Sequence, residues 1–110
     1  METGTLVLVH LHSPKEKYWG ILRALSPAGV TLRGIDVALF DDWARQYVTG
    51  GETELGAATF FFPLHRVEKM FEDARVGAVA AYHERFLEMV GRDVRGVLAP
   101  EPSRSEGPLQ

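Results

Sequence analysis

The sequence contains no cysteine, so the chain has no disulfide bond and no thiol nucleophile. Histidine, aspartate and glutamate are therefore the side chains expected as metal ligands. Long apolar runs are also missing: residues 6–9 form one of the longest, far below the roughly 20 residues that a membrane-spanning helix needs. No basic segment precedes an apolar stretch near residue 1, so we expect no membrane association and a cytoplasmic location.

An excess of positive charge is missing as well. Twelve Lys and Arg face 15 Asp and Glu, which gives a formal net charge of -3. This balance argues against a protein that coats duplex nucleic acid, because neutralising phosphates requires clustered cations. A local basic patch is left open, and with nine Arg and three Lys it would favour guanidinium contacts.

What the sequence does contain is typical of one globular domain. The chain has 110 residues, 45% of them hydrophobic and 25% charged, which is enough for a single core. The last residues are rich in Pro, Ser and Glu and have little to bury. We therefore predict one domain over residues 1–98 and a disordered tail over residues 99–110.

Apolar and alternating stretches predict strands at residues 5–12, 17–25, 29–35 and 57–62. A tight turn at residues 26–29, SPAG, joins the second and third strands. Aromatic and aliphatic residues at helical spacing predict an inserted helix at 37–48 that begins at Asp36 and ends at Gly50. A similar stripe predicts a second helix at 78–90, before Gly91.

Residues 64–74 are ambiguous from periodicity. Their apolar positions recur at helical spacing, and Pro63 suits a first helical position. The alternation of Val67, Lys69 and Phe71 fits a strand less well. Periodicity therefore favours a helix in this segment.

Two stretches resemble the Sm-like (Lsm/Hfq-type) family and suggest a divergent bacterial member. GILRALSPAGVTLR (residues 20–33) aligns on the family's second and third strands, and FFFPLHRVEKMF (residues 60–71) aligns on the fourth and fifth. The resemblance implies a mainly β fold with added helices, built on a five-stranded Sm-like/SH3-like bent antiparallel barrel. It also assigns residues 66–72 to the last strand rather than to a helix.

The family's RNA site is only half present. In the turn between the second and third strands, where the family has an acidic and then a large residue, this chain has Ser26 and Ala28. Stacking of a base is worth about 1–3 kcal/mol, so this loss is substantial. Leu64 replaces a basic residue, whereas His65 remains and Arg66 follows it. The resemblance therefore implies that His65 and Arg66 contact RNA.

The resemblance also implies assembly. Sm-like subunits close a ring by pairing the fourth strand of one copy with the fifth strand of the next. We therefore expect a homo-oligomer, in ring form or limited by the added helices. The expected interface residues are apolar edge-strand positions: Phe60, Phe61, Phe62, Val67, Met70 and Phe71.

A second nucleic-acid candidate is the loop around Lys15, Lys17 and Tyr18, where charge and an aromatic ring could grip single-stranded RNA. The alternative is that Tyr18 or Trp19 faces the core and the lysines keep the loop soluble.

Catalytic and metal chemistry have weak support. His10 and His12 share a strand face and could bind a metal with His65 or Glu52, but no stronger ligand motif accompanies them. Adjacent acids such as Glu72 and Asp73 point in different directions, and we expect the pair to lie where a strand meets solvent. No nucleophile elbow or phosphate-binding glycine loop occurs. We expect no enzyme, metal or cofactor.

Two functions therefore compete. The first is an oligomeric Sm-like protein that binds RNA with a degenerate site, as an accessory factor in RNA metabolism. The second is a non-enzymatic oligomeric interaction module that has lost RNA binding and docks a protein partner through its added helices.

Overall fold

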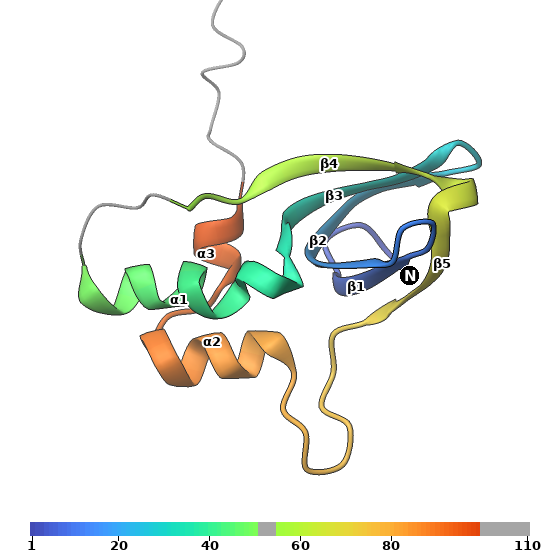
Figure 1. Ribbon diagram of the computed structural model, residues 1–110. Helices are drawn as coiled ribbons and strands as arrows, with labels where there is room; N and C mark the ends of the chain where they lie inside the picture. Colours follow the sequence, from blue (N-terminus) through green and yellow to red (C-terminus); the bar gives the residue numbers. More distant parts are fainter. Residues whose placement is uncertain (51–54, 100–110) are drawn as a thin grey trace, which may run out of the picture.

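A computed structural model describes residues 1–50 and 55–99 (Figure 1). Five antiparallel strands form one sheet in the order β4-β3-β2-β1-β5. The sheet is open, because the edge strands β4 and β5 do not pair with each other. The strands are β1 Leu6–Leu11, β2 Glu16–Ser26, β3 Gly29–Asp36, β4 Ala58–Pro63 and β5 Val67–Glu72.

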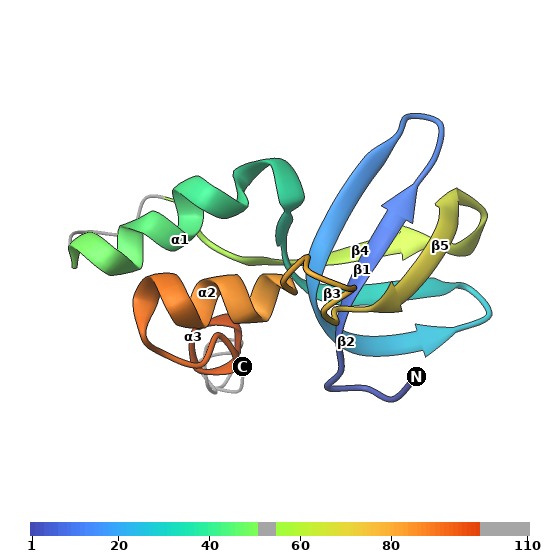
Figure 2. The same ribbon diagram turned by 90° about the horizontal axis from the view of Figure 1, so that it is seen from below.

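The predicted mainly β fold is confirmed, with one helix between the third and fourth strands and another after the fifth. The helical elements are η1 Val37–Leu39, α1 Phe40–Thr49, η2 Leu64–Arg66, α2 Tyr82–Val90 and α3 Arg95–Leu98. Helices α1, α2 and α3 gather together to one side of the sheet (Figure 2). The predicted tail lies outside the described residues from residue 100 onward.

The first inserted helical segment begins and ends as predicted. The Asp36 side chain accepts a hydrogen bond from the N–H of Ala38 at 2.9 Å, and Gly50 ends α1 with a φ of 73°. Gly91 likewise ends α2, but α2 begins at Tyr82 rather than at residue 78. The preceding residues instead form a narrow hairpin, in which Val76 pairs with Val79.

The helix that periodicity favours over residues 64–74 is wrong. The strand that the family resemblance implies in this segment is confirmed as β5. Val67 to Glu72 pair with β1 in an antiparallel register that runs from Leu11↔Val67 to Val7↔Glu72. Pairing with a neighbouring strand overrides the local helical spacing, since sheet stability depends on cross-strand contacts.

The sheet bends where β2 and β3 approach each other closely. Gly20 pairs with Gly34, and a Cβ added at Gly20 would lie 2.2 Å from the carbonyl oxygen of Arg33. The β2–β3 register then shifts between Leu22 and Ala24. Two glycines and an irregularity therefore allow the strands to cross and curl.

Each face of the sheet has its own core. The first, the strand core, is largely aliphatic and comprises Val7, Val9, Leu11, Leu22, Val30, Leu32 and Phe62. The second, the helix-side core, joins the sheet to the helices and comprises Leu6, Leu8, Trp19, Ile21, Ile35, Phe40, Trp43, Ala44, Phe86, Val94 and Leu98. Phe40 and Trp43 of α1 are both fully buried in the helix-side core.

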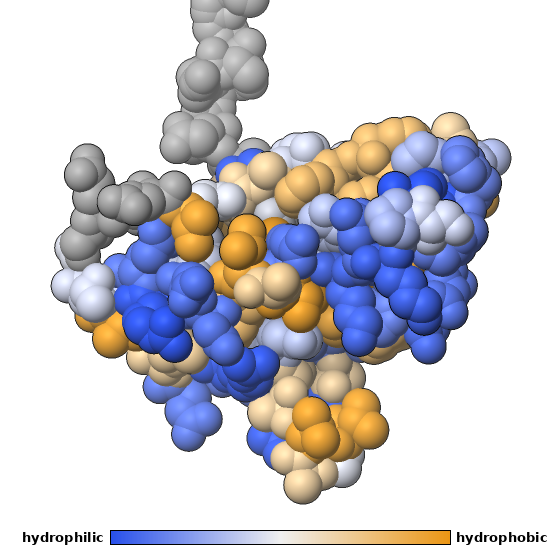
Figure 3. Space-filling model, in the orientation of Figure 1, coloured by the Kyte–Doolittle hydropathy of each residue, from blue (hydrophilic) through white to orange (hydrophobic). Residues whose placement is uncertain are grey.

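The surface is mixed, with one projecting apolar tip. The segment between β5 and α2 extends away from the molecule, and its end is apolar (Figures 1 and 3). Val76 and Val79 in this hairpin are 72% and 70% exposed. Among the described residues, no helix is both long and apolar enough to cross a membrane.

Candidate nucleic-acid interface

Three cationic or titratable side chains lie in one row across adjacent strands. His10 of β1 is the register partner of Lys17 in β2 and of Lys69 in β5. Paired residues in antiparallel strands project from the same face, so these three side chains are neighbours. The row continues the face that carries Leu8 and Trp19, beyond the part buried by the helices.

A cavity of about 610 Å³ lies over this row. We call it the lysine pocket. It brings together all three lysines of the chain, from the β1–β2 loop, β2 and β5. The residues that line it are His10, Leu11, Lys15, Glu16, Lys17, Asp36, Val37, Ala38, Glu68 and Lys69.

The pocket also contains three acids, and one of them, Glu16, is paired with a cation outside the pocket lining. Glu16 pairs with Arg66 at 3.1 Å, and Asp36 accepts the N–H of Ala38. Glu68 is exposed. Within residues 1–50 and 55–99, none of the three lysines forms an ion pair with an acid. Their charges are therefore available to an anionic ligand.

The pKa of His10 reflects its burial and the positive charges of the pocket. Burial lowers its pKa from the ordinary value of 6.5, and the positive charges of Lys17 and Lys69 lower it further. The ring also makes an edge contact with Phe71 at 5.0 Å between centroids. An anion bound among the lysines would offset their effect, so ligand binding and His10 protonation are expected to be coupled.

The structure places the predicted RNA-contacting residues in different environments. Lys15 and Lys17 are exposed and lie in the lysine pocket. Tyr18 projects from the opposite face of β2, where its ring lies 4.8 Å from the rings of Phe60 and Phe62. Burial, with a smaller contribution from Glu16 and Asp36, raises the pKa of Tyr18. The Tyr18 ring therefore packs within the chain, on the face of β2 opposite the lysine pocket.

His65 and Arg66 also lie in different environments. His65 is exposed on η2. The Arg66 guanidinium donates to the carbonyls of His12 at 3.0 Å and Pro14 at 3.1 Å, in addition to its bond to Glu16. Arg66 therefore fixes the β1–β2 loop that carries Lys15, and this is a supporting position beside the pocket.

The predicted interface residues also have a role within the chain. Phe62 is buried in the strand core, and Phe60, Val67 and Met70 pack partly against it. Phe61 and Phe71 are 55% and 40% exposed. Of the six predicted interface residues, only Phe61 and Phe71 present large exposed apolar surfaces. Their strands, β4 and β5, are the two edges of the sheet.

The expectation that the Glu72–Asp73 pair lies at the surface is wrong for Asp73, which is buried. Its side chain is 3% exposed and accepts hydrogen bonds from the indole N–H of Trp19 and the backbone N–H groups of Tyr82 and His83. It also contacts Nδ1 of His83 at 2.9 Å. The carboxyl group therefore links β2, β5 and the start of α2.

Two groups were not found from sequence for physical reasons. Lys69 joins Lys17 only through the pairing of both strands with β1, and residue spacing contains no such signal. Asp73 lies nine residues before the helix residue whose N–H it accepts, far outside the usual capping positions. A short polar stretch after a strand would have been the only hint.

The histidines weighed as metal ligands do not form a metal cluster. No group of three or more His, Asp or Glu side chains suited to a metal occurs in the part of the chain that the structure describes. His12 instead contacts the Ser13 hydroxyl at 3.1 Å. Glu52, the other candidate ligand, lies outside the described residues.

Comparison of the chain with protein-family models, curated proteins and solved structures found no match.

Proposed function

We propose that this chain is a divergent Sm-like protein that assembles into oligomers and binds single-stranded RNA through the lysine pocket, in a cytoplasmic role in RNA metabolism. The strand order and the bent five-stranded sheet are consistent with this resemblance. We propose no catalytic step, metal or cofactor for this binding.

The observation that carries the proposal is the convergence of Lys15, Lys17 and Lys69. Their charges come together although the chain as a whole is acidic, and none of them has an acidic ion-pair partner among the described residues. Single-stranded nucleic acids bind to such grooves mainly through their phosphates. Three cations in one cavity provide a short phosphate-binding track, which a uniformly distributed charge would not.

The proposed RNA contact differs from the one that the resemblance alone implies. His65 is exposed but does not line the lysine pocket, whereas Arg66 and Tyr18 are engaged within the chain. Lys15 and Lys17 keep the role expected from sequence, and Lys69 joins them. Without an exposed stacking platform in the pocket, binding should depend on phosphate charge more than on base identity.

The direct test is fluorescence anisotropy with labelled A-rich and U-rich oligonucleotides at two salt concentrations. Three phosphate contacts predict a slope of about -2 for log affinity against log salt, and similar affinity for both sequences. Absence of binding at low salt would refute the RNA proposal. Strong preference for one base sequence would show that the pocket is not the main contact.

Assembly is proposed to use the two sheet edges. Strands β4 and β5 leave one side of each backbone without a strand partner in the described residues, and this supports pairing between copies. Static light scattering should then give a mass above that of a monomer. Phe61→Lys places charge on an exposed edge position and should lower this mass, whereas Leu25→Lys, at an exposed position of the internal strand β2, should not. A monomer at all concentrations would contradict this part of the proposal.

The second candidate is a protein-interaction module without RNA binding. The projecting Val76–Val79 hairpin favours it, because exposed apolar tips are commonly used in contacts with other proteins. An oligomeric protein that fails to bind either oligonucleotide at low salt would support this candidate over the first.

A further inference from the structure

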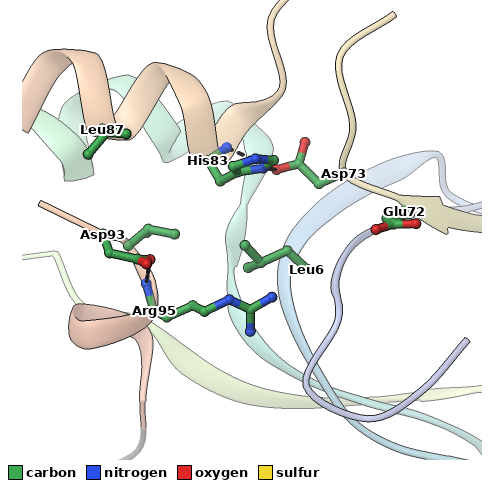
Figure 4. A pocket seen from close by; sticks show the side chains of 8 residues that line it. Leu6, Glu72, Asp73, His83, Leu87, Asp93 and Arg95 are labelled. Carbon is green, nitrogen blue, oxygen red and sulfur yellow. Dashed lines mark hydrogen bonds and ion pairs between the residues drawn. The ribbon is translucent and has the colours of Figure 1, made fainter.

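A second cavity, separate from the lysine pocket, lies between the start of β1, the end of β5, α2 and the loop before α3. Its volume is about 330 Å³. We call it the Asp73 pocket. Figure 4 shows its charged and titratable side chains around Leu6: Glu72, Asp73, His83, Asp93 and Arg95. Leu87 and Val94 complete the lining.

His83 is held in one orientation at this cavity. Asp73 is buried and accepts a hydrogen bond from Nδ1 of His83, at 2.9 Å. Because a carboxylate can only accept, Nδ1 is assigned the proton and Nε2 is left for other partners. The Asp73 side chain also accepts two α2 backbone N–H groups and the Trp19 indole, so the histidine is fixed to a rigid element.

Arg95 supplies the permanent positive charge. One of its guanidinium nitrogens donates to the Gly4 carbonyl, and the others have no hydrogen bond within residues 1–50 and 55–99. Figure 4 shows its guanidinium extending toward Leu6, with His83 on another side of the cavity. A phosphate between these two side chains would receive charge-assisted hydrogen bonds from the Arg95 guanidinium, and Nε2 of His83 would donate one when the imidazole is protonated.

The two remaining carboxylates define the rest of the ligand. Glu72 and Asp93 are exposed members of the lining, and each can accept hydrogen bonds from hydroxyl groups. Asp93 also accepts the backbone N–H of Arg95 at 2.9 Å, which fixes its position. Inorganic phosphate would leave these acids without hydroxyl donors from the ligand's carbon chain, and an uncharged polyol would leave Arg95 without an anionic partner.

We propose that the Asp73 pocket binds a small polyhydroxylated organic phosphate, of the sugar phosphate class. The phosphate would lie between His83 and Arg95, the hydroxyl groups would donate to Glu72 and Asp93, and the carbon chain would contact Leu6 and Val94. The volume is near the lower limit of ligand pockets, which suits one sugar ring. This site is independent of the proposed RNA contact, since the two cavities share no residue.

The test is titration of the full chain with ribose 5-phosphate, followed by backbone amide NMR. We expect saturable shifts at Leu6, His83 and Arg95 at about 10 mM ligand or below, a range that detects even millimolar affinity. Ribose and inorganic phosphate at the same concentration should each bind at least about tenfold more weakly.

The matched variants are Arg95→Gln and Arg92→Gln. Each removes one exposed arginine charge, but Arg92 lies over the Tyr47 ring and does not line the cavity. Arg95→Gln should weaken binding at least about tenfold, while Arg92→Gln should leave it unchanged. Melting temperatures of both variants exclude unfolding as the cause, and Glu72→Gln provides a second variant on the hydroxyl side that should reduce the preference over inorganic phosphate.

Three results would overturn the proposal. These are no shift at the highest concentration, equal binding by ribose 5-phosphate and inorganic phosphate, and shifts centred on Lys17 and Lys69 instead. None of the three depends on whether the chain binds RNA.

Discussion

The two pockets use charge in opposite ways. In the Asp73 pocket, the central carboxyl group is buried and its hydrogen bonds connect the sheet to α2. In the lysine pocket, the cations lie on strands and a loop and have no ion-pair partner among the described residues. Removing the first group should therefore damage the fold, whereas removing the second should affect only what binds there.

The comparison shows why charge alone is a poor guide to function. Asp73 and Lys69 lie four residues apart in the chain, yet one is fixed by four hydrogen bonds and the other is exposed. A charged group whose hydrogen bonds are satisfied inside the protein contributes to stability. One whose charge is left unpaired at a cavity is a better candidate for ligand binding.

The largest predicted effect is that of Asp73→Ala. The variant leaves the Trp19 indole and the first backbone N–H groups of α2 without their acceptor, so the free energy of unfolding should fall by about 3 kcal/mol. Urea denaturation followed by tryptophan fluorescence measures this change. Asp42→Ala, which removes an exposed acid paired with Arg45, should change it by less than about 0.5 kcal/mol. Equal losses in the two variants would contradict the buried role of Asp73.

Arg66→Gln should have an intermediate effect. The glutamine cannot reproduce the three hydrogen bonds to the β1–β2 loop and Glu16, so stability should fall by about 1 kcal/mol. The melting temperature reports this loss, with Arg45→Gln as the surface control. A variant with unchanged stability and lost RNA binding would instead make Arg66 a direct RNA contact.

The smallest effect concerns His10. NMR titration should give a pKa below 6.5, and Lys69→Gln should raise it because one of the positive charges that lowers it is removed. The folded state therefore binds its proton less readily than the unfolded chain, so stability attributable to His10 falls as pH drops below 6.5. RNA binding should raise the pKa of His10. An unchanged His10 pKa in the Lys69→Gln variant would contradict the effect of Lys69 on His10.

Much of the fold was predictable from sequence because its signals are local. The SPAG turn, the Asp36 cap and the glycines after α1 and α2 each determine their own neighbourhood. Residues 67–72 required the family resemblance, since their helical spacing competes with pairing to β1. The late start of α2 was missed because the Val76–Val79 hairpin precedes it.

The sites were less predictable because they depend on contacts between distant segments. Lys15 and Lys17 were identified as a local basic loop, but Lys69 reaches them only through the sheet register. The sequence left Tyr18 either at the RNA site or facing the core, and strand alternation turns its ring toward Phe60 and Phe62. Asp73 is buried although the sequence predicts the Glu72–Asp73 pair at the surface. The sequence does not reveal this burial, because the hydrogen-bond partners of Asp73 come from β2 and α2.

The most direct test of the central claim is the salt dependence of RNA affinity in the triple variant Lys15→Gln, Lys17→Gln, Lys69→Gln. Each lysine that contacts a phosphate contributes about 0.7 to the slope, so the slope of about -2 should fall close to zero while the melting temperature stays unchanged. Arg45→Gln, which removes a distant exposed charge, should keep the wild-type slope. A triple variant that binds RNA with the wild-type slope would show that the lysine pocket is not the RNA site.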